Sequence, residues 1–224
     1  MSQHTKCIVI AIDGPAASGK GVVAKAIAKH FGYDHMDTGR LYRAVSYLLM
    51  KNGVAPEDKE KVLHFARQAS KNEQLIEGVV PEEELRAKEV CSMASKIGSI
   101  PELREILNEF QRAFPKGRKG AVLDGRDIGS SIFPDAQCKL YITAKLEIRA
   151  ERRYKQLQIL DKSIIYSEVV RDLKERDERD ISRKVSPLQI PKGASILDTT
   201  DITQEEAIQR ALEIVASSLA NIND

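Results

Sequence analysis

The stretch Ile8-Val-Ile-Ala-Ile-Asp13, followed at once by Gly14-Pro-Ala-Ala-Ser-Gly-Lys20-Gly21, decides the fold of this chain. The apolar run does not alternate with polar residues, so we expect a strand that is buried on both faces, as in a parallel sheet. A helical pattern of Ala, Val and Lys follows the glycines over residues 22–31. Strand, glycine-rich loop and helix in this order predict a loop that binds phosphate.

The physical reason lies in the backbone of the loop. Gly14 and Gly19 allow backbone angles that are closed to other residues. The N–H groups of residues 17–21 can then point at one anion, with the N-terminus of the helix behind them. Lys20 adds a flexible positive charge for the β- and γ-phosphates. Because Gly21 stands where a Ser or Thr hydroxyl would hold Mg²⁺, an ordinary glycine-rich turn is the alternative.

The composition limits the possible classes of protein. The chain has 224 residues, of which 42% are hydrophobic and 30% are charged, and this length suits one α/β domain with insertions. A net charge of +2 gives no support to a general nucleic-acid or membrane-surface role. The three cysteines are far apart and show no CxxC spacing, which indicates a reducing compartment. No apolar run approaches membrane-spanning length, so we expect a soluble, cytoplasmic protein.

Strand and helix patterns alternate along the chain. Besides the first strand, we expect strands at residues 33–36, 120–123, 139–143 and 194–197, and a further short one at 75–76. Helical patterns cover residues 41–51, 56–69, 82–97, 101–114, 146–160, 166–176 and 203–219. This alternation predicts an α/β fold with about five parallel strands and helices on both faces of the sheet.

Two regions do not belong to the alternation. One is the helical stretch 41–114, and the other is the charged hairpin 146–183. Open α/β sheets bind ligands at the carboxyl edge of their strands, where both regions are expected to be inserted. Insertions at that edge can close over a substrate.

The charged hairpin is rich in arginine. Its arginines are Arg149, Arg152, Arg153, Arg171, Arg176, Arg179 and Arg183. A solvated hairpin held by salt bridges is the ordinary explanation of such a run. However, Arg suits bidentate recognition of phosphate, and phosphoryl transfer depends on positioning and electrostatics.

Two further motifs carry charged groups to the ends of expected strands. Asp124-Gly-Arg-Asp127 follows a buried run, so Asp124 is placed to address Mg²⁺ directly or through water, while Arg126 and Asp127 face a second substrate. A turn with a structural ion pair is the alternative. Asp37-Thr-Gly-Arg-Leu-Tyr-Arg43 puts Arg43 on the first turns of a helix, where a capped helix with a surface arginine is the alternative.

Taken together, these motifs resemble the bacterial cytidylate kinases, a branch of the nucleoside monophosphate kinases. The resemblance runs in order from near residue 8 to near residue 200, and its specific elements are Asp124-Gly-Arg-Asp127 and Glu175-Arg-Asp-Glu-Arg-Asp180. The other matching pieces are the phosphate loop, Asp37 to Arg43, Glu89-Val, Ala94-Ser95, Pro101 to Arg104, Gln111 to Phe114, Phe133 to Ala136, Arg149 to Arg153 and Arg183.

The resemblance implies a three-layer P-loop core, a mostly helical monophosphate-binding insert and a helical lid. The corresponding segments are 1–37, 115–145 and 184–224 for the core, 38–114 for the insert with its flanking helices, and 146–183 for the lid. Between Ala69 and Arg86 the chain looks shorter than many relatives, so the small β-sheet found there is expected to be reduced or absent.

The activity implied is phosphoryl transfer from ATP to CMP or dCMP, in pyrimidine nucleotide metabolism. The implied cofactor is Mg²⁺, carried by ATP without a direct protein ligand and reached through water by Asp124. The implied partners are these nucleotides alone, with neither nucleic acid nor membrane, and the expected state is a monomer.

The resemblance also implies a role for particular residues. For ATP they are Gly14, Pro15, Ala16, Ala17, Ser18, Gly19, Lys20, Gly21, Val22, Arg149 and Arg153. For CMP, the residues implied to bind the acceptor phosphate are Arg43 and Arg126. Those implied to bind the cytosine edge are Thr38, Arg104, Asp127 and Arg183. Those implied to lie near the sugar are Ser95, Arg176 and Asp180. For catalysis they are Lys20, Asp124, Arg126 and Arg153. The family often has Thr where this chain has Val22, which removes a hydroxyl near the α-phosphate or metal.

The chemistry of these residue types agrees with cytosine as the base. Asp127 can accept a hydrogen bond from the N4 amino group, and Arg104 can donate to O2 and N3, whereas uracil would present O4 to a carboxylate. A P-loop kinase acting on UMP or another small acceptor is one rival hypothesis. A nucleotide-dependent switch is a second, although the chain has no Asn-Lys-x-Asp element. A nucleic-acid-driven ATPase is the weakest, given the near-neutral charge.

Overall fold

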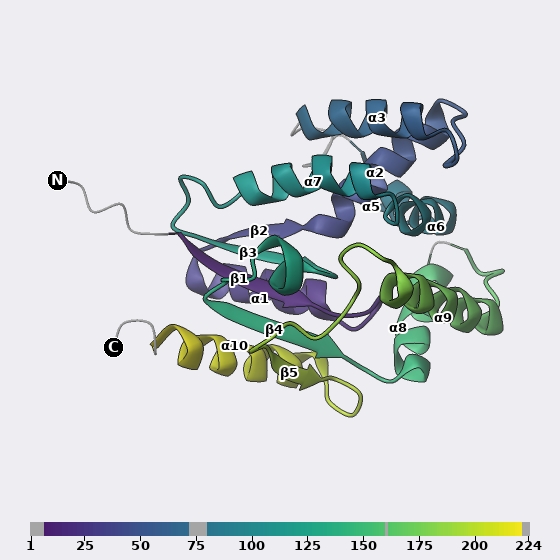
Figure 1. Ribbon diagram of the computed structural model, residues 1–224. Coiled ribbons are helices and arrows are strands. Elements are labelled where there is room, and N and C mark those ends of the chain that lie inside the picture. Colours follow the sequence, from purple (N-terminus) through teal and green to yellow (C-terminus); the bar gives the residue numbers. More distant parts are fainter. Residues whose placement is uncertain (1–6, 72–79, 160, 221–224) are drawn as a thin grey trace. The chain divides into compact units, whose positions relative to one another are not determined.

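The computed structural model describes residues 7–71, 80–159 and 161–220. Within them, five strands form one sheet in the order β2-β3-β1-β4-β5 (Figure 1). The strands are β1 (Ile8–Asp13), β2 (Asp34–Asp37), β3 (Gly120–Gly125), β4 (Cys138–Thr143) and β5 (Ser195–Asp198). β1 pairs in parallel with β3 and β4, and β4 pairs in parallel with β5. The predicted α/β fold with a parallel sheet is therefore confirmed, whereas the expected strand at 75–76 lies outside the described residues.

The chain forms two compact units. The first comprises Met1–Met36, Pro115–Ser182 and Ser186–Asp224, and the second comprises Asp37–Phe114 with Arg183–Val185. Each unit has its own packing.

The core of the first unit lies between the sheet and two helices. α1 (Lys20–Phe31) and α10 (Gln204–Ala220) pack side by side against the strands. Their buried residues form one cluster with Ile10 and Ile12 of β1, which are fully buried. Because successive residues of a strand point to opposite faces, Ala11 and Asp13 point away from these helices.

A short π-helical turn, η1 (Ile128–Ile132), contacts β1 and β3. Sequence periodicity gives no signal for this element, since π-helical turns are rare and often lie at functional sites. The turn begins directly after Asp127, which has φ of −148° and ψ of 24°. It therefore starts where the motif Asp124-Gly-Arg-Asp127 ends.

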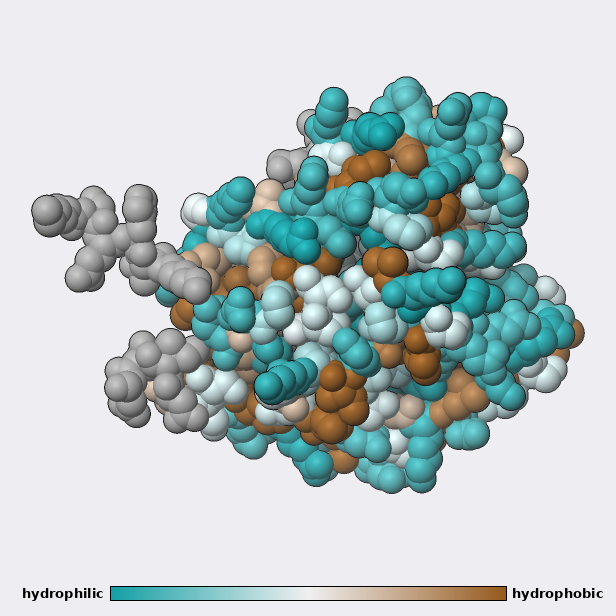
Figure 2. Space-filling model, viewed as in Figure 1, coloured by the Kyte–Doolittle hydropathy of each residue, from teal (hydrophilic) through white to brown (hydrophobic). Residues whose placement is uncertain are grey.

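The charged hairpin consists of α8 (Leu146–Gln158) and α9 (Tyr166–Ser182). A small apolar cluster joins the two helices to the loop after β1, and it contains Ala16, Ala150, Leu157, Val169 and Leu173. Hydrophilic side chains predominate on the visible surface of these helices (Figure 2). The hairpin is thus charged outside and held by apolar contacts inside.

Apart from Asp37, the last residue of β2, the regular secondary structure described in the second unit is helical. It contains α2 (Thr38–Lys51), α3 (Lys59–Lys71), α5 (Glu82–Leu85), α6 (Lys88–Ile97) and α7 (Pro101–Ala113). α2 packs on α3, α5 and α6, and α3 packs on α7. The single helix predicted at 82–97 is broken, because Ala87 takes an extended conformation (φ −53°, ψ 146°) between α5 and α6.

Capping side chains begin two of the helices. The Asp37 carboxylate accepts the N–H of Arg40 at the start of α2. At α10, Thr203 and Glu206 form the reciprocal capping box, with N–H to side-chain distances of 2.8 and 3.1 Å. Among the described residues, no helix is long and apolar enough to cross a membrane.

Candidate functional site

The loop between β1 and α1 has a backbone that depends on its glycines. Gly14 has φ of +153°, and a Cβ there would lie 2.0 Å from the carbonyl oxygen of Ile142. Gly19, the N-cap of α1, is left-handed with φ of 88°. Ala17 is also left-handed, with φ of 59°, a conformation that is uncommon outside glycine and recurs at ligand sites. The two glycines singled out from the sequence are therefore required by this conformation.

The polar groups of this loop are a cation and a buried hydroxyl. Lys20 donates through Nζ to the carbonyl oxygen of Pro15 at 3.3 Å, so its side chain folds over the loop. Ser18 is fully buried, and its Oγ has no hydrogen-bond partner within the described part of the chain. Val22 lies on the exposed side of α1. A buried hydroxyl without a partner calls for an explanation, and a ligand oxygen would supply one.

Thr199, the residue after β5, is hydrogen-bonded to the backbone of the loop between β1 and α1. Its Oγ1 lies 3.2 Å from the carbonyl oxygen of Ser18 and 3.1 Å from that of Thr143. Arg152 donates to Thr199 through both terminal nitrogens, at 2.9 Å to Oγ1 and 2.6 Å to the carbonyl oxygen. Neither Thr199 nor Arg152 has a specific role that the sequence predicts, because nothing in the local pattern reveals a contact over such sequence separations.

Arg149 joins the hairpin to the same loop. Its guanidinium donates to the carbonyl oxygens of Ala16 and Ala144, at 3.2 and 2.8 Å. It also forms an ion pair of 2.6 Å with Asp177 of α9. The structure therefore places Arg149 beside the phosphate loop, but with its donors directed to protein oxygens. Arg153 lies one helical turn further along α8 and is half-buried.

Asp124 lies at the carboxyl end of β3 and is buried. Its Oδ2 is 2.8 Å from Nε2 of His35, a residue of β2 that the sequence analysis did not single out. A Cβ built on Gly21 would lie 3.8 Å from Asp124 Oδ1, so this carboxylate faces the start of α1. Across the described ranges, no group of three or more His, Cys, Asp or Glu side chains is arranged to hold a metal ion by itself.

Two of the predicted acceptor residues, Arg126 and Arg176, meet at the carboxylate of a third, Asp180 on α9. Arg126 donates through Nε to Asp180 Oδ2 at 2.9 Å, and it also donates to the carbonyl oxygen of Gly125. Arg176 Nε lies 4.0 Å from the same Oδ2. The Asp180 side chain is only 8% exposed, so the two guanidinium groups share one nearly buried counter-ion. The structure thus brings together Arg126, Arg176 and Asp180.

Asp13, at the end of β1, is another buried carboxylate that the sequence analysis left without a role. It accepts the backbone N–H groups of Ile128 and Gly129, both at 2.7 Å. Burial raises the pKa of Asp13 to about 7, although the two N–H groups and the charge of Lys20 lower it. The neighbouring carboxylate of Asp127 raises it further. An aspartate directly before the first glycine of the loop is the signal that could have identified it.

In the second unit, Arg43 folds back on the residue that caps its helix. Its Nη2 donates to Asp37 Oδ2 at 2.8 Å. A Cβ on Gly39 would lie 2.9 Å from Arg43 Nη1 and 3.1 Å from Asp37 Oδ1, so Gly39 makes room for this pair. Burial alone would lower the pKa of Arg43, but the Asp37 carboxylate, Cys91 and Glu82 together raise it. Arg43 is therefore held as a cation.

Three of the other predicted residues of this unit are buried polar groups, whereas Arg183 is only partly buried. Arg104 is 2% exposed, donates to the carbonyl oxygen of Gly98 at 3.2 Å and lies over the ring of Tyr42. Thr38 and Ser95 are also buried. Burying hydroxyl and guanidinium groups costs free energy that their partners must offset, as the Gly98 carbonyl does for Arg104.

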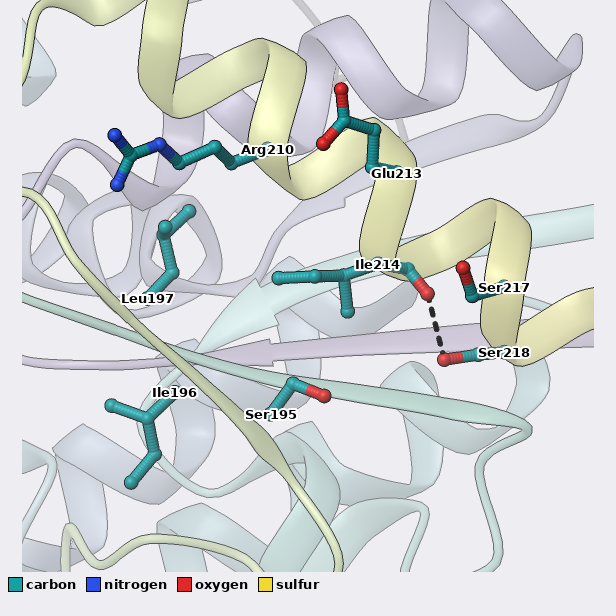
Figure 3. A pocket seen from close by; sticks show the side chains of 8 residues that line it. All are labelled: Ser195, Ile196, Leu197, Arg210, Glu213, Ile214, Ser217 and Ser218. Carbon is teal, nitrogen blue, oxygen red and sulfur yellow. Dashed lines mark hydrogen bonds between the residues drawn. The ribbon is translucent and has the colours of Figure 1, made fainter.

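A pocket of about 570 Å³ lies elsewhere, between β5 and α10 (Figure 3). Its lining residues are Ser195, Ile196, Leu197, Arg210, Glu213, Ile214, Ser217 and Ser218. Ser218 donates to the Ile214 carbonyl oxygen within its own helix. None of the candidate nucleotide-binding residues lines this pocket, and it has no part in the site described above.

A sequence model of the cytidylate kinase family matches residues 10–217. The chain belongs to the cytidylate kinase family. Curated members include the cytidylate kinase of Paramagnetospirillum magneticum, which is 46% identical over 93% of this chain and 98% of its own length. The cytidylate kinase of Caldanaerobacter subterraneus is 42% identical over 93% of this chain and 94% of its own length.

Solved structures agree with this family's fold. A gluconokinase from Sinorhizobium meliloti has a TM-score of 0.52 at 14% identity, with 97% of each chain covered. An uncharacterised protein from Eubacterium ventriosum has a TM-score of 0.54 at 13% identity, covering 94% of this chain and 99% of its own. At these identities the likeness concerns the fold alone, and it confirms the P-loop arrangement of this cytidylate kinase family member.

Proposed function

We propose that this chain transfers the γ-phosphoryl group of ATP to CMP or dCMP, giving ADP and CDP or dCDP. The observation that carries the proposal is the match to the cytidylate kinase family over residues 10–217, in a chain whose β1 ends in a glycine-dependent phosphate loop. Curated relatives with the printed name cytidylate kinase match it over nearly their whole length.

The donor nucleotide is assigned to the first unit. Residues 14–22 form the loop that receives the phosphates, and the hydroxyl of Ser18 and the ammonium of Lys20 are its polar side chains. Arg153 adds charge from α8, while Arg149 holds the hairpin against the carbonyl oxygen of Ala16. Arginines that reach the transferring group from a lid supply both charge and position.

The residues beside the loop fit a magnesium ion carried by ATP. Mg²⁺ keeps several waters and is held by one or two carboxylates together with substrate phosphates. Asp124 offers one buried carboxylate that faces Gly21. Asp124 would reach the ion through water, with His35 fixing its second oxygen. The ion, when bound, neutralises charge on the phosphates.

For the acceptor we propose that Arg43 and Arg126 bind the phosphate of CMP. Asp127, Thr38, Arg104 and Arg183 are assigned to the cytosine edge, and Ser95, Arg176 and Asp180 to the sugar. The ion pair of Arg126 with Asp180 fixes the guanidinium before substrate arrives, and such pre-organisation lowers the cost of binding.

The reaction needs positioning rather than a general base. A phosphate oxygen of CMP, already an anion, forms a bond to the γ-phosphorus of ATP. The bond from that phosphorus to the oxygen bridging to the β-phosphate breaks, and ADP leaves with the electron pair. Lys20, Arg126 and Arg153 stabilise the charge that develops on the transferred group. Closure of the hairpin would exclude water and so suppress hydrolysis of ATP.

The proposal is tested by ADP formation from ATP with and without CMP. We expect turnover that depends strictly on CMP or dCMP and that is lost in Lys20→Met. Lys25→Met, an exposed lysine of the same helix, is the matched control and should keep full activity. Turnover without an acceptor would instead favour a nucleotide-dependent switch.

A kinase specific for UMP is distinguished by the base-reading carboxylate. If Asp127 accepts the N4 amino group of cytosine, Asp127→Ala should lower the preference for CMP over UMP. An unchanged preference would favour the rival assignment, in which the base is read elsewhere.

A further inference from the structure

Asp13 links the end of β1 to the segment that carries Arg126 and Asp127. We propose that Asp13 is a positioning residue for the acceptor nucleotide, fixing that segment relative to the phosphate loop. The inference rests on the proposed function, because Arg126 and Asp127 are assigned there to the acceptor.

The contacts of Asp13 are those of a cap supplied from another element. Asp127 is the N-cap residue of η1, but its side chain makes no capping hydrogen bond. The two oxygens of Asp13 do this instead, one accepting from Ile128 N–H and the other from Gly129 N–H. Asp13 therefore satisfies the first donors of the turn, and the Asp127 carboxylate is not required for capping.

The surroundings leave this link little freedom. A Cβ on Gly129 would lie 3.3 Å from Asp13 Oδ2 and 3.1 Å from Cγ of Pro191, so a larger residue would press on the carboxylate. On the other side, the next residue in the chain is Gly14, where an added Cβ would lie 2.0 Å from the carbonyl oxygen of Ile142. One buried carboxylate thus joins two backbone segments that are each closely packed.

This geometry makes the substitution Asp13→Asn informative. Asparagine keeps the size of the side chain but has a single acceptor oxygen, so its amide NH₂ would face one of the two backbone N–H groups. A buried N–H left without an acceptor shifts the segment or costs stability. Small displacements of positioned groups lower rates by up to about a hundredfold. The phosphate loop keeps its hydrogen bond from Thr199 to the carbonyl oxygen of Ser18, so the loss should appear in the kinetics of the acceptor rather than in those of ATP.

The experiment measures steady-state kinetics of Asp13→Asn with each substrate varied in turn. We expect kcat/KM for CMP to fall by at least about tenfold, and the ratio of CMP to UMP to fall with it. The KM for ATP should stay within about twofold of the wild type. Val215→Ala, which opens a cavity in the core of α10 away from the site, should lower stability and leave both KM values and the CMP to UMP ratio unchanged.

If Asp13→Asn does not fold, a second variant tests the positioning role of Asp13. Gly129→Ala keeps the carboxylate and displaces it, so it should also lower selectivity for CMP, and the added change Pro191→Ala should restore part of it. Unchanged CMP kinetics and base selectivity in a folded Asp13→Asn or Gly129→Ala protein would overturn the inference while leaving the function intact. A wild-type protein that does not phosphorylate CMP would instead overturn the proposed function.

Discussion

His35 Nε2 and Asp124 Oδ2 lie 2.8 Å apart, so a side chain of β2 holds the carboxylate at the end of β3. Both side chains are nearly buried, at 15% and 5% exposed. The other oxygen of Asp124 faces Gly21, at the start of the helix behind the phosphate loop. The orientation of this carboxylate is thus set by a residue in another strand.

The first prediction follows from that orientation. His35→Ala should raise the Mg²⁺ concentration required for half-maximal velocity by about tenfold, because outer partners of metal-directed groups have effects of 10–100-fold. Titration of the rate with Mg²⁺ at fixed ATP is the measurement. His64→Ala, an exposed histidine of α3, is the control and should leave the titration unchanged. Identical titrations for His35→Ala and the wild type would show that Asp124 does not act through magnesium.

The second prediction concerns the pH dependence of the rate. The folded-state pKa of Asp13 is about 7, raised mainly by burial and also by Asp127, and lowered by the two N–H groups and Lys20. Tyr141 of β4 interacts with the Asp13 charge: burial raises the pKa of that phenol, and the charges of Asp177 and Asp13 raise it further. Above pH 7 the ionised carboxyl accepts both N–H groups, so kcat/KM for CMP should rise between pH 6 and 8. CMP contributes its own phosphate ionisation near pH 6, and comparison with Asp13→Asn removes that contribution.

The raised pKa of Asp13 also determines how the free energy of unfolding changes with pH. Because the pKa is raised above its unfolded value of 3.8, the folded state binds the proton more tightly. The contribution of Asp13 to the free energy of unfolding therefore decreases as the pH rises from about 4 to about 7. Urea denaturation at several pH values should show a smaller decrease for Asp13→Asn. A decrease equal to that of the wild type would mean that Asp13 does not titrate in this range.

The third prediction uses the space that Gly39 leaves for Arg43. Gly39→Ala should raise the KM for CMP about tenfold, since the methyl group displaces a guanidinium assigned to the acceptor phosphate. Alanine is favoured over glycine inside a helix, but the methyl group would also lie 3.1 Å from Asp37 Oδ1, the capping oxygen of this helix, so no gain in stability is expected. In an Arg43→Ala background, Gly39→Ala should have no further effect. An equal effect in both backgrounds would show that the methyl group acts on something other than Arg43.

The fourth prediction separates two arginines of α8. Arg149→Ala should lower the free energy of unfolding by about 3 kcal/mol, because it leaves the largely buried Asp177 carboxylate, 15% exposed, without its ion-pair partner. Arg153→Ala should change stability by less than about 1 kcal/mol, as expected for a partly exposed charge, but lower kcat. Denaturation curves and initial rates of both variants test this. A loss of kcat without a loss of stability in Arg149→Ala would reassign it to the donor nucleotide.

The sequence was sufficient for the parts of the fold that depend on local pattern. The unbroken apolar run of β1, the glycines at positions 14 and 19 and the capping box of α10 all have local physical signatures, and all are found in the structure. The break between α5 and α6 was missed, because Glu82 to Ile97 is compatible with one continuous helix.

The missed parts of the site are contacts between distant segments. Asp13 reaches Ile128 and Gly129 across the sheet, and Arg152 reaches Thr199 after β5. Each pairing depends on strand order, which periodicity alone does not supply. The roles of Arg43, Arg104 and Arg183 toward CMP stay predictions drawn from the family resemblance.

The most direct measurement of the central claim is the initial rate of ADP formation with CMP, dCMP, UMP, AMP and GMP at equal concentrations. The account predicts that CMP or dCMP exceeds every other acceptor by at least about tenfold, because the proposed cytosine site would leave buried polar groups unpaired with other bases. Equal or faster turnover of AMP or GMP would contradict it.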